Sequence, residues 1–302
     1  MGANQLINRS TLVRAMAEAM RLAATRLPPD VEAALRAAKD DETEPIAVEQ
    51  LRVSLENARL AQDAGGLVCG DTGFPLFFVT SGNGATIEGG FGTLWEAARK
   101  ATRCVTDECY LRPTMVDPLT RHNPGDNCGP GMPKVELRFE GDGEGLEIVA
   151  APKGGGSEIF GTFYRMLFPS DGETGIMKFV LDSVRDGCYA GKICPPAIIG
   201  VGIGGTADLC VKMAKEAAVL RRVGTPHRDS EIDALERRLV AAIKELGIGP
   251  MGSKGRNAVM AVHIETALTH TAALPVAVNA QCLVGRRWTA TVGADNTITY
   301  AG

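Results

Sequence analysis

The sequence predicts a mixed α/β protein in which an N-terminal helical subdomain precedes an α/β subdomain. Residues 9–38 and 44–64 carry apolar side chains at helical spacing. From residue 66 onward, short apolar runs alternate with helical segments and glycine-rich loops. Hydrophobic residues make up 45% and charged residues 23%, which is ordinary for a globular protein. We therefore expect a helical subdomain at 1–65 and an α/β subdomain at 66–302.

The elements follow in order along the chain. Asn8 and Ser10 are candidates to cap the first helix, and Gly65-Gly66 ends the second. The turn Gly141-Asp142-Gly143 predicts that the strands on either side of it pair as a hairpin. Further helices are expected at 93–104, 176–185, 207–220 and 230–246, and strands at 76–80, 134–139, 147–151, 197–201, 259–264, 275–280 and 288–292.

Charge and hydropathy exclude several functional classes. The net charge of -4 gives no basic surplus for nucleic acid or an anionic membrane. Met1–Gln5 shows no charged flank followed by an apolar run, so no signal peptide is expected. The apolar stretch 197–205 is too short to cross a bilayer, which takes about 20 residues. We expect a cytoplasmic protein with no membrane or nucleic-acid partner.

Eight cysteines are the first candidates for chemistry. No C-x-x-C pair occurs, which argues against zinc ribbons and ferredoxin-like clusters. Cys69, Cys194 and Cys282 lie at element ends, where sites are usually built. On spacing alone, Cys188 competes with Cys194, and Cys128 is an outside candidate. The remaining cysteines are expected to be packing residues: Cys104, Cys109 and Cys210.

Two other motifs suggest different chemistry. Gly200–Gly205 fits G-x-G-x-x-G after a strand and before a helix, but no acidic residue follows at the expected place in 220–226. We prefer tight strand–helix packing and keep a nucleotide-binding oxidoreductase as the alternative. His263-Ile264-Glu265 has the H-x-E pattern of zinc deaminases but lacks their P-C-x-x-C element, so we expect a structural histidine.

Six motifs in order carry a family resemblance. They are Cys69-Gly70-Asp71-Thr72-Gly73, Tyr110-Leu111-Arg112, Asn123-Pro124-Gly125-Asp126-Asn127, Lys153-Gly154-Gly155-Gly156-Ser157, Cys194-Pro195-Pro196 and Leu274-Pro275-Val276-Ala277-Val278. Together they resemble the α subunit of iron–sulfur class I fumarases and L(+)-tartrate dehydratases, from about Ala47 to Val292.

The resemblance implies a [4Fe–4S] cluster held by three cysteines. The matching positions are Cys69, Cys194 and Cys282, and the Cys-Pro-Pro context selects Cys194 over Cys188. Three thiolates leave one iron open as a Lewis acid, which can polarise the C–O bond of a 2-hydroxy diacid.

The resemblance also implies roles for residues around the cluster. Arg112 matches the arginine that binds a substrate carboxylate, and Asp71 an aspartate that positions substrate or transfers a proton. Gly155 matches a backbone contact to substrate, and His270 a histidine near the site. Gly70 stands in the substrate-contacting position where the family commonly has glutamine, which bears on specificity.

One-chain members of the family have a further domain that supplies part of the site, including the base. Since this chain ends at Gly302, we expect a separate β subunit in an α2β2 assembly. Fumarate hydration to malate is the expected reaction, and L(+)-tartrate dehydration to oxaloacetate is the close alternative. A non-catalytic cluster carrier is a third hypothesis.

Overall fold

The computed structural model describes residues 6–302. The segment Met1–Gln5, on which the signal-peptide expectation falls, lies outside the described residues. The chain divides into two compact units. Unit 1 contains the chain up to Pro28 together with Leu60–Lys153 and Arg286–Gly302, and unit 2 contains Pro29–Arg59 and Gly154–Gly285.

The N-terminal region forms three helices. They are α1 (Arg9–Thr25), α2 (Pro29–Asp41) and α3 (Pro45–Ala64). The prediction of one helix over 9–38 is wrong because Arg26 is extended and Pro28-Pro29 follows it. A proline disfavours helical backbone at the preceding residue, so a new helix begins at Pro29. α1 belongs to unit 1 and α2 to unit 2, so the contacts divide along a different line from the boundary at residue 65, which stays a sequence prediction.

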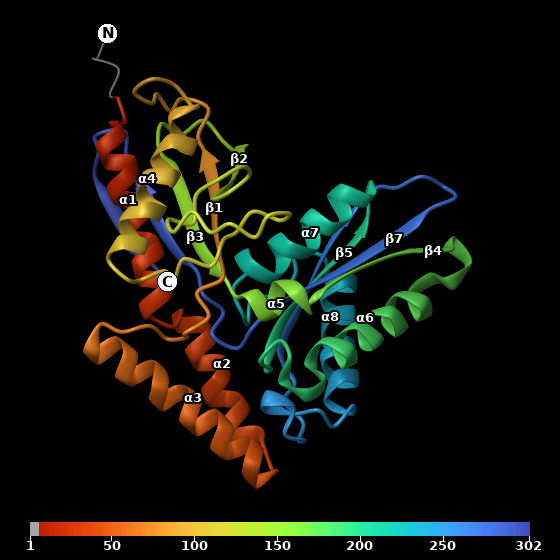
Figure 1. Ribbon diagram of the computed structural model, residues 1–302. Coiled ribbons are helices and arrows are strands. Elements are labelled where there is room, and N and C mark those ends of the chain that lie inside the picture. Colours follow the sequence, from red (N-terminus) through yellow and green to blue (C-terminus); the bar gives the residue numbers. More distant parts are fainter. Residues whose placement is uncertain (1–5) are drawn as a thin grey trace. The chain divides into compact units, whose positions relative to one another are not determined.

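Unit 1 is built on a five-stranded mixed sheet. Its strand order is β2 (Lys134–Phe139), β1 (Phe74–Ser81), β3 (Leu146–Lys153), β8 (Trp288–Val292) and β9 (Ile298–Ala301). α1 and α4 (Thr93–Asp107) lie side by side against the sheet (Figure 1). Leu12 and Met16 of α1 and Leu94 of α4 are fully buried in one core with Phe77 and Ile148 of the sheet.

The expected hairpin of β2 and β3 is not formed. β1 lies between them, parallel to β2 and antiparallel to β3. β1 is the most apolar strand of this sheet and is buried over most of its length, which favours a central place. The 140–145 turn packs onto Gly82, where a Cβ would lie 2.0 Å from the Gly143 carbonyl oxygen. The turn therefore crosses the end of β1.

Unit 2 is built on a four-stranded sheet. Its strand order is β4 (Thr162–Leu167), β7 (Leu274–Gln281), β5 (Ala197–Gly204) and β6 (Val259–Ala267). α7 (Ala207–Leu220) packs on one face, and α6 (Gly172–Cys188) and α8 (Ser230–Lys244) supply the core on the other (Figure 1). Short helices complete the unit: α5 (Gly155–Ile159), η1 (Pro169–Asp171), η2 (Tyr189–Gly191) and η3 (Pro250–Gly252).

The mixed α/β class is confirmed. The helices and strands expected after residue 66 are present, with ends that differ by a few residues. β4 and β9 were not predicted, because their side chains are mostly exposed or half-buried and show no apolar alternation. Across residues 6–302, none of the helices is both long enough and apolar enough to span a membrane.

Candidate functional site

The loop that contains Cys69 is hydrogen-bonded to the segment that contains Arg112. The Arg112 backbone N–H donates to Thr72 Oγ1 at 2.9 Å, and its guanidinium donates to the Gly70 carbonyl oxygen at 3.1 Å. Thr72 is fully buried, whereas Asp71 and the Arg112 side chain are exposed. Three of the predicted site residues, Cys69, Asp71 and Arg112, are thus brought together within unit 1.

Asn127 braces the Arg112 segment from behind. Its Oδ1 accepts the backbone N–H groups of Thr114 and Met115 at 2.9 and 3.2 Å. Its Nδ2 donates at 3.0 Å both to the Arg112 carbonyl oxygen and to Thr106 Oγ1 of α4. Asn127 is buried and has a φ of 58°, a conformation that asparagine adopts more readily than most residues. It anchors an otherwise irregular segment, 108–133, to a helix.

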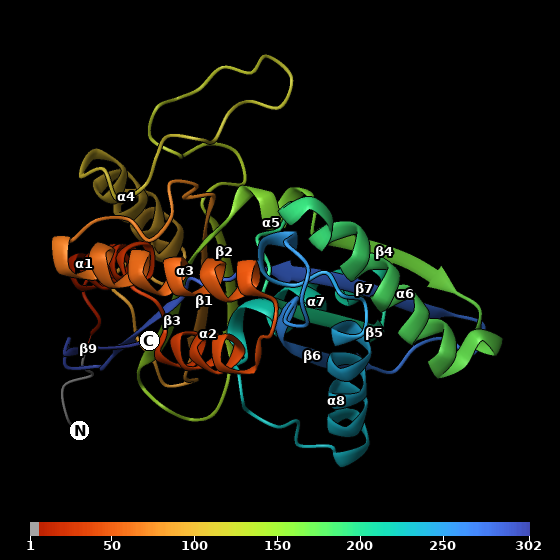
Figure 2. The ribbon, with the colours of Figure 1, turned by 90° about the horizontal axis from the view of Figure 1, so that it is seen from below.

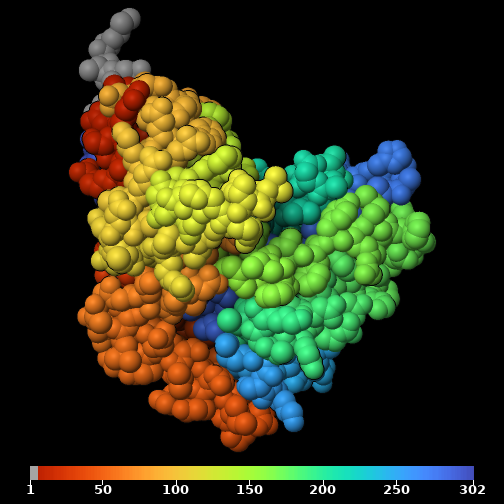
Figure 3. All heavy atoms as spheres, viewed as in Figure 1, coloured from red at the N-terminus to blue at the C-terminus, as the bar shows by residue number. Residues whose placement is uncertain are grey.

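This irregular segment covers much of the visible surface of unit 1. It extends away from the sheet and returns to β2 (Figure 2), and its atoms form a continuous patch in Figure 3. The sequence identified Asn127 only as part of a motif and did not predict its hydrogen bonds to the Arg112 segment. The signal was available, since an asparagine that ends a glycine-containing turn is a candidate for side-chain-to-backbone hydrogen bonds.

In unit 2, the segments that contain Cys194 and Cys282 are hydrogen-bonded to each other. Leu283, which follows Cys282, donates its N–H to the Cys194 carbonyl oxygen at 3.0 Å. The Cys194 N–H donates to Gly191 at 2.9 Å, and Cys194 itself has a φ of 53°. Cys194 is half-buried and Cys282 is buried. These two cysteines therefore lie at adjacent loop positions at one end of the sheet.

The three cysteines are divided between the units, with Cys69 in unit 1 and the other two in unit 2. Within the described part of the chain, no three His, Cys, Asp or Glu side chains are gathered as a ready metal site. The chemistry of the donor set still fits an iron–sulfur cluster, because thiolate sulfur is the ligand such clusters take. The ligand set stays a prediction.

The other cysteines are placed as packing residues or weak donors. Cys188 is fully buried at the end of α6, and burial raises the pKa of its thiol to about 12. Cys210 donates to the Gly202 carbonyl oxygen at 3.2 Å, and burial raises its pKa to about 11. Burial also raises the pKa of Cys128, and a hydrogen bond to Glu108 raises that of Cys104. Since the thiolate is the ligating form, burial favours Cys194 over Cys188 as a ligand.

Gly155 and His270 lie at different places in unit 2. Gly155 begins α5, and a Cβ on the next residue, Gly156, would lie 2.9 Å from the Lys192 carbonyl oxygen. His270 lies in the loop between β6 and β7, where its Nδ1 accepts the Ala272 N–H at 3.1 Å. The eight residues of β7, about 26 Å of strand, separate this loop from Cys282. The structure does not place His270 beside Cys282.

The glycines of the G-x-G-x-x-G motif serve strand–helix packing, as we preferred. A Cβ at Gly200 would lie 2.0 Å from the Ala214 carbonyl oxygen, and one at Gly202 would lie 2.1 Å from that of Cys210. Both contacts are with the backbone of α7, which cannot yield without moving the helix. These glycines therefore let β5 approach α7 rather than a bound dinucleotide. The motif on which the dinucleotide hypothesis depended has a packing role instead.

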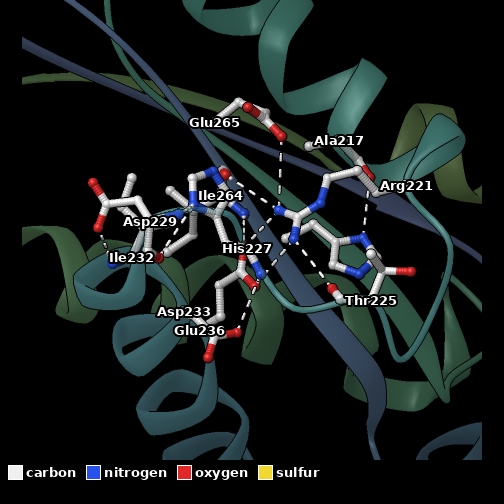
Figure 4. Close-up of polar contacts among 11 residues, drawn as sticks. Ala217, Arg221, Thr225, His227, Asp229, Ile232, Asp233, Glu236, Ile264 and Glu265 are labelled. Atoms are coloured by element: carbon white, nitrogen blue, oxygen red, sulfur yellow. Dashed lines mark hydrogen bonds and ion pairs between the residues drawn. The ribbon is translucent and has the colours of Figure 1, made fainter.

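His263 is structural, also as expected. It is 2% exposed, and its Nδ1 lies 3.2 Å from the Ala217 carbonyl oxygen. The neighbouring ion pair of Arg221 and Glu236 covers the outer edge of β6 (Figure 4). Glu236 accepts the Ile264 N–H at 2.7 Å, and Arg221 donates to the Ile264 carbonyl oxygen at 3.3 Å. Side chains here take the place of a further strand.

Comparison with known proteins gives the family. Residues 13–291 match the family model described as fumarate hydratase (Fumerase). A Methanocaldococcus jannaschii protein, provisionally named L(+)-tartrate dehydratase subunit alpha, is 42% identical over 274 residues, which cover 89% of this chain and 93% of that protein. The L(+)-tartrate dehydratase subunit alpha of an Escherichia coli strain is 34% identical over 293 residues, 97% of this chain and 94% of its own length. The same identity and coverage hold for the Shigella sonnei protein of that name. The chain belongs to the fumarate hydratase (Fumerase) family, a family of hydro-lyases.

Proposed function

We propose that this chain is the α subunit of an iron–sulfur hydro-lyase that acts on a four-carbon dicarboxylate. The observation that supports it most directly is the pair of hydrogen bonds that joins Arg112 to Thr72 and Gly70. These bonds hold the Arg112 guanidinium next to Cys69 and Asp71. The proposed reaction needs all three of these side chains in one place. A thiolate, a carboxylate and a bidentate cation on adjacent loops suit a substrate with two carboxylates.

The residues of this chain have distinct parts in the proposed reaction. Cys69, Cys194 and Cys282 would hold a [4Fe–4S] cluster, which when bound supplies a Lewis acid for the substrate hydroxyl group. The Arg112 guanidinium donates one N–H to the Gly70 carbonyl oxygen, and its other N–H groups can bind a substrate carboxylate. Asp71 is exposed beside it and can hold a proton on a carboxylate oxygen or orient the substrate. Gly155 and His270 remain candidates by resemblance alone.

The curated relatives favour L(+)-tartrate as the substrate. The matched proteins of Methanocaldococcus jannaschii and Escherichia coli are both named for that reaction, and each aligns over about nine-tenths of its length. We therefore place tartrate dehydration to oxaloacetate first, ahead of the fumarate hydration that the motifs suggested. Fumarate hydration is the second candidate, because the family model carries that name. Gly70, with open space around its Cβ position, would leave room for the second hydroxyl group of tartrate.

A β subunit is part of the proposal. The matched relatives are named as alpha subunits, which implies a partner chain in those enzymes. We propose that a separate β subunit supplies the base and completes the site, in an α2β2 assembly. The chain alone would then take up iron and sulfide but turn over poorly.

The test is anaerobic co-expression with a β subunit, followed by reconstitution and assays on L(+)-tartrate and fumarate. We expect wild type to contain iron and sulfide in equal amounts and to favour tartrate. Cys69→Ser, Cys194→Ser and Cys282→Ser should each lose the intact cluster, whereas Cys109→Ser, which alters an exposed cysteine outside the proposed set, should keep it. Arg112→Lys should lower kcat/KM by about 100-fold or more with the cluster intact.

Three results would count against the proposal. A full cluster in any of the three serine variants would remove that residue from the ligand set. Equal kinetics of Arg112→Lys and the exposed-surface variant Arg121→Lys would remove Arg112 from substrate binding. A strong preference for fumarate over tartrate would reverse the order of the two substrates without changing the reaction class.

A further inference from the structure

Left-handed backbone is concentrated in two loops of unit 2. The loop 189–196 contains Ala190 and Cys194, with φ values of 54° and 53°, and the loop 249–255 contains Met251 and Lys254, with φ values of 52° and 69°. Half of the eight non-glycine residues with positive φ in the described chain therefore lie in these two short segments. Each such residue costs about 1 kcal/mol or more, so the surrounding contacts must hold it in place.

The two loops hold each other through backbone contacts. The Met251 N–H donates to the Pro195 carbonyl oxygen at 2.8 Å, next to Cys194. A Cβ at Gly252 would lie 2.7 Å from the Gly191 nitrogen, and a Cβ at Gly191 would lie 2.7 Å from the Met251 carbonyl oxygen. The two loops are thus packed backbone to backbone. Only glycine, which has no Cβ, permits so close an approach.

Glu42 fixes the far end of the 249–255 loop. Its buried carboxylate accepts the backbone N–H of Arg256 at 3.0 Å and that of Asn257 at 3.1 Å, as well as the Asn257 side-chain amide at 3.1 Å. Burial acts to raise the pKa of Glu42, but the hydrogen bonds from the Thr43 N–H and from the backbone and side chain of Asn257 hold the pKa below its ordinary value. The ionised carboxylate therefore anchors the chain directly after the loop.

We propose that the 249–255 loop is a backbone clamp that positions the Cys194 side chain for cluster binding. Met251 and Gly252 hold the backbone of Pro195 and Gly191, which follow and precede Cys194 in the chain, and the Leu283 N–H donates to the Cys194 carbonyl oxygen. With these contacts fixed, the left-handed backbone of Cys194 is over-determined, which sets the direction of its Cα–Cβ bond. The clamp rests on the proposed function, because it assigns Cys194 a ligand role.

Gly252→Ala tests the clamp, with Gly247→Ala as its matched control. Both glycines have positive φ, 71° and 65°, so both substitutions carry the same backbone penalty. Only at position 252 does the new Cβ meet another loop, since the Cβ position at Gly247 has no heavy atom within 4 Å. Any difference between the two variants therefore reports the contact between the loops.

The readout is the alkylation rate of each cysteine in the cluster-free chain, followed by mass spectrometry of peptides. Gly252→Ala should raise the rate at Cys194 by roughly tenfold relative to Gly247→Ala and leave Cys69, in the other unit, unchanged. Glu42→Gln, which weakens the anchor without a clash, should change the Cys194 rate in the same direction by a smaller factor. This second variant keeps the test decisive if Gly252→Ala does not fold.

The clamp would be overturned if Cys194 were alkylated at equal rates in Gly252→Ala and Gly247→Ala. If Gly252→Ala is unfolded, equal rates in Glu42→Gln and wild type would overturn it. Iron content after anaerobic reconstitution gives the second readout, and Gly252→Ala should retain less iron than Gly247→Ala. Failure of the proposed function is seen separately, as wild type that takes up no cluster. The alkylation rates still decide whether the loop positions Cys194 in that case.

Discussion

The two parts of the candidate site are held in different ways. Around Arg112 in unit 1, side chains brace the loops: Thr72 and Asn127 both hydrogen-bond the Arg112 backbone. In unit 2, backbone meets backbone: Gly191 and Gly252 let two loops touch near Cys194, and Gly200 lets β5 touch α7. Side-chain bracing leaves room around the exposed Asp71 and Arg112, whereas glycine packing leaves none.

This difference has a chemical consequence. Arg112 and Asp71 lie on loops whose supports are hydrogen bonds, each worth about 1 kcal/mol, so those loops can adjust to a substrate. Cys194 lies on a loop held by steric contact, which is steep in distance and suits a ligand of fixed geometry. Substitutions should therefore act differently around these two sets of loops, and the largest effects should come from glycines packed against backbone.

Gly200→Ala should be the most damaging of these changes. The new Cβ would lie 2.0 Å from the Ala214 carbonyl oxygen and 2.4 Å from the Ala218 nitrogen, so α7 must move away from β5. We expect the free energy of unfolding to fall by about 3 kcal/mol or more, measured by urea denaturation.

Gly70→Ala is the counterpart in unit 1. Its Cβ position has no heavy atom within 4 Å and its φ is not positive, so stability should change by less than about 0.5 kcal/mol. A similar loss of stability in both variants would show that the contrast between glycines packed against backbone and glycines in open space is wrong.

Asn127→Ala should have the next largest effect. It removes four hydrogen bonds, leaves the Thr114 and Met115 N–H groups without their acceptor, and puts alanine at a φ of 58°. We expect a loss of about 2–4 kcal/mol in the free energy of unfolding, together with a rise in KM as Arg112 loses its brace.

Asn123→Ala is the matched control, because Asn123 is exposed and its two hydrogen bonds, to Pro113 and Gly125, reach neither Arg112 nor α4. It should cost under about 1 kcal/mol. If the two asparagine variants unfold at the same urea concentration, Asn127 is not a brace.

These contrasts mark what the sequence could predict. Apolar periodicity predicted most helices and strands, because an element that buries one face carries apolar residues at a regular spacing. β4 was not predicted because most of its side chains are exposed and it lacks this pattern. Motif order predicted Cys69, Asp71 and Arg112, which the fold brings together. The β2–β3 hairpin was wrong because strand order depends on contacts between distant residues, here those of β1. The roles of Asn127 and Gly252 depend on the same kind of contact and were not visible in local spacing.

The smallest effect is expected from alkaline pH and separates Cys188 from its neighbour Cys194. Burial raises the pKa of Cys188 from 9.0 to about 12, so the folded state favours the neutral thiol. The stability that this thiol contributes is complete below pH 9 and is lost as the pH rises from 9 toward 12, because the unfolded chain ionises first. Between pH 8 and pH 10 the loss should be about 1.4 kcal/mol.

Cys188→Ala isolates this contribution from other groups that titrate in the same range, Cys210 among them. The variant should be less stable than wild type at pH 8, since it leaves a small cavity in the core of unit 2. Its urea midpoint should nevertheless fall less than that of wild type between pH 8 and pH 10. Parallel slopes in the two proteins would mean that Cys188 ionises readily in the folded chain, and a thiol that does so six residues before Cys194 would become a rival ligand once more.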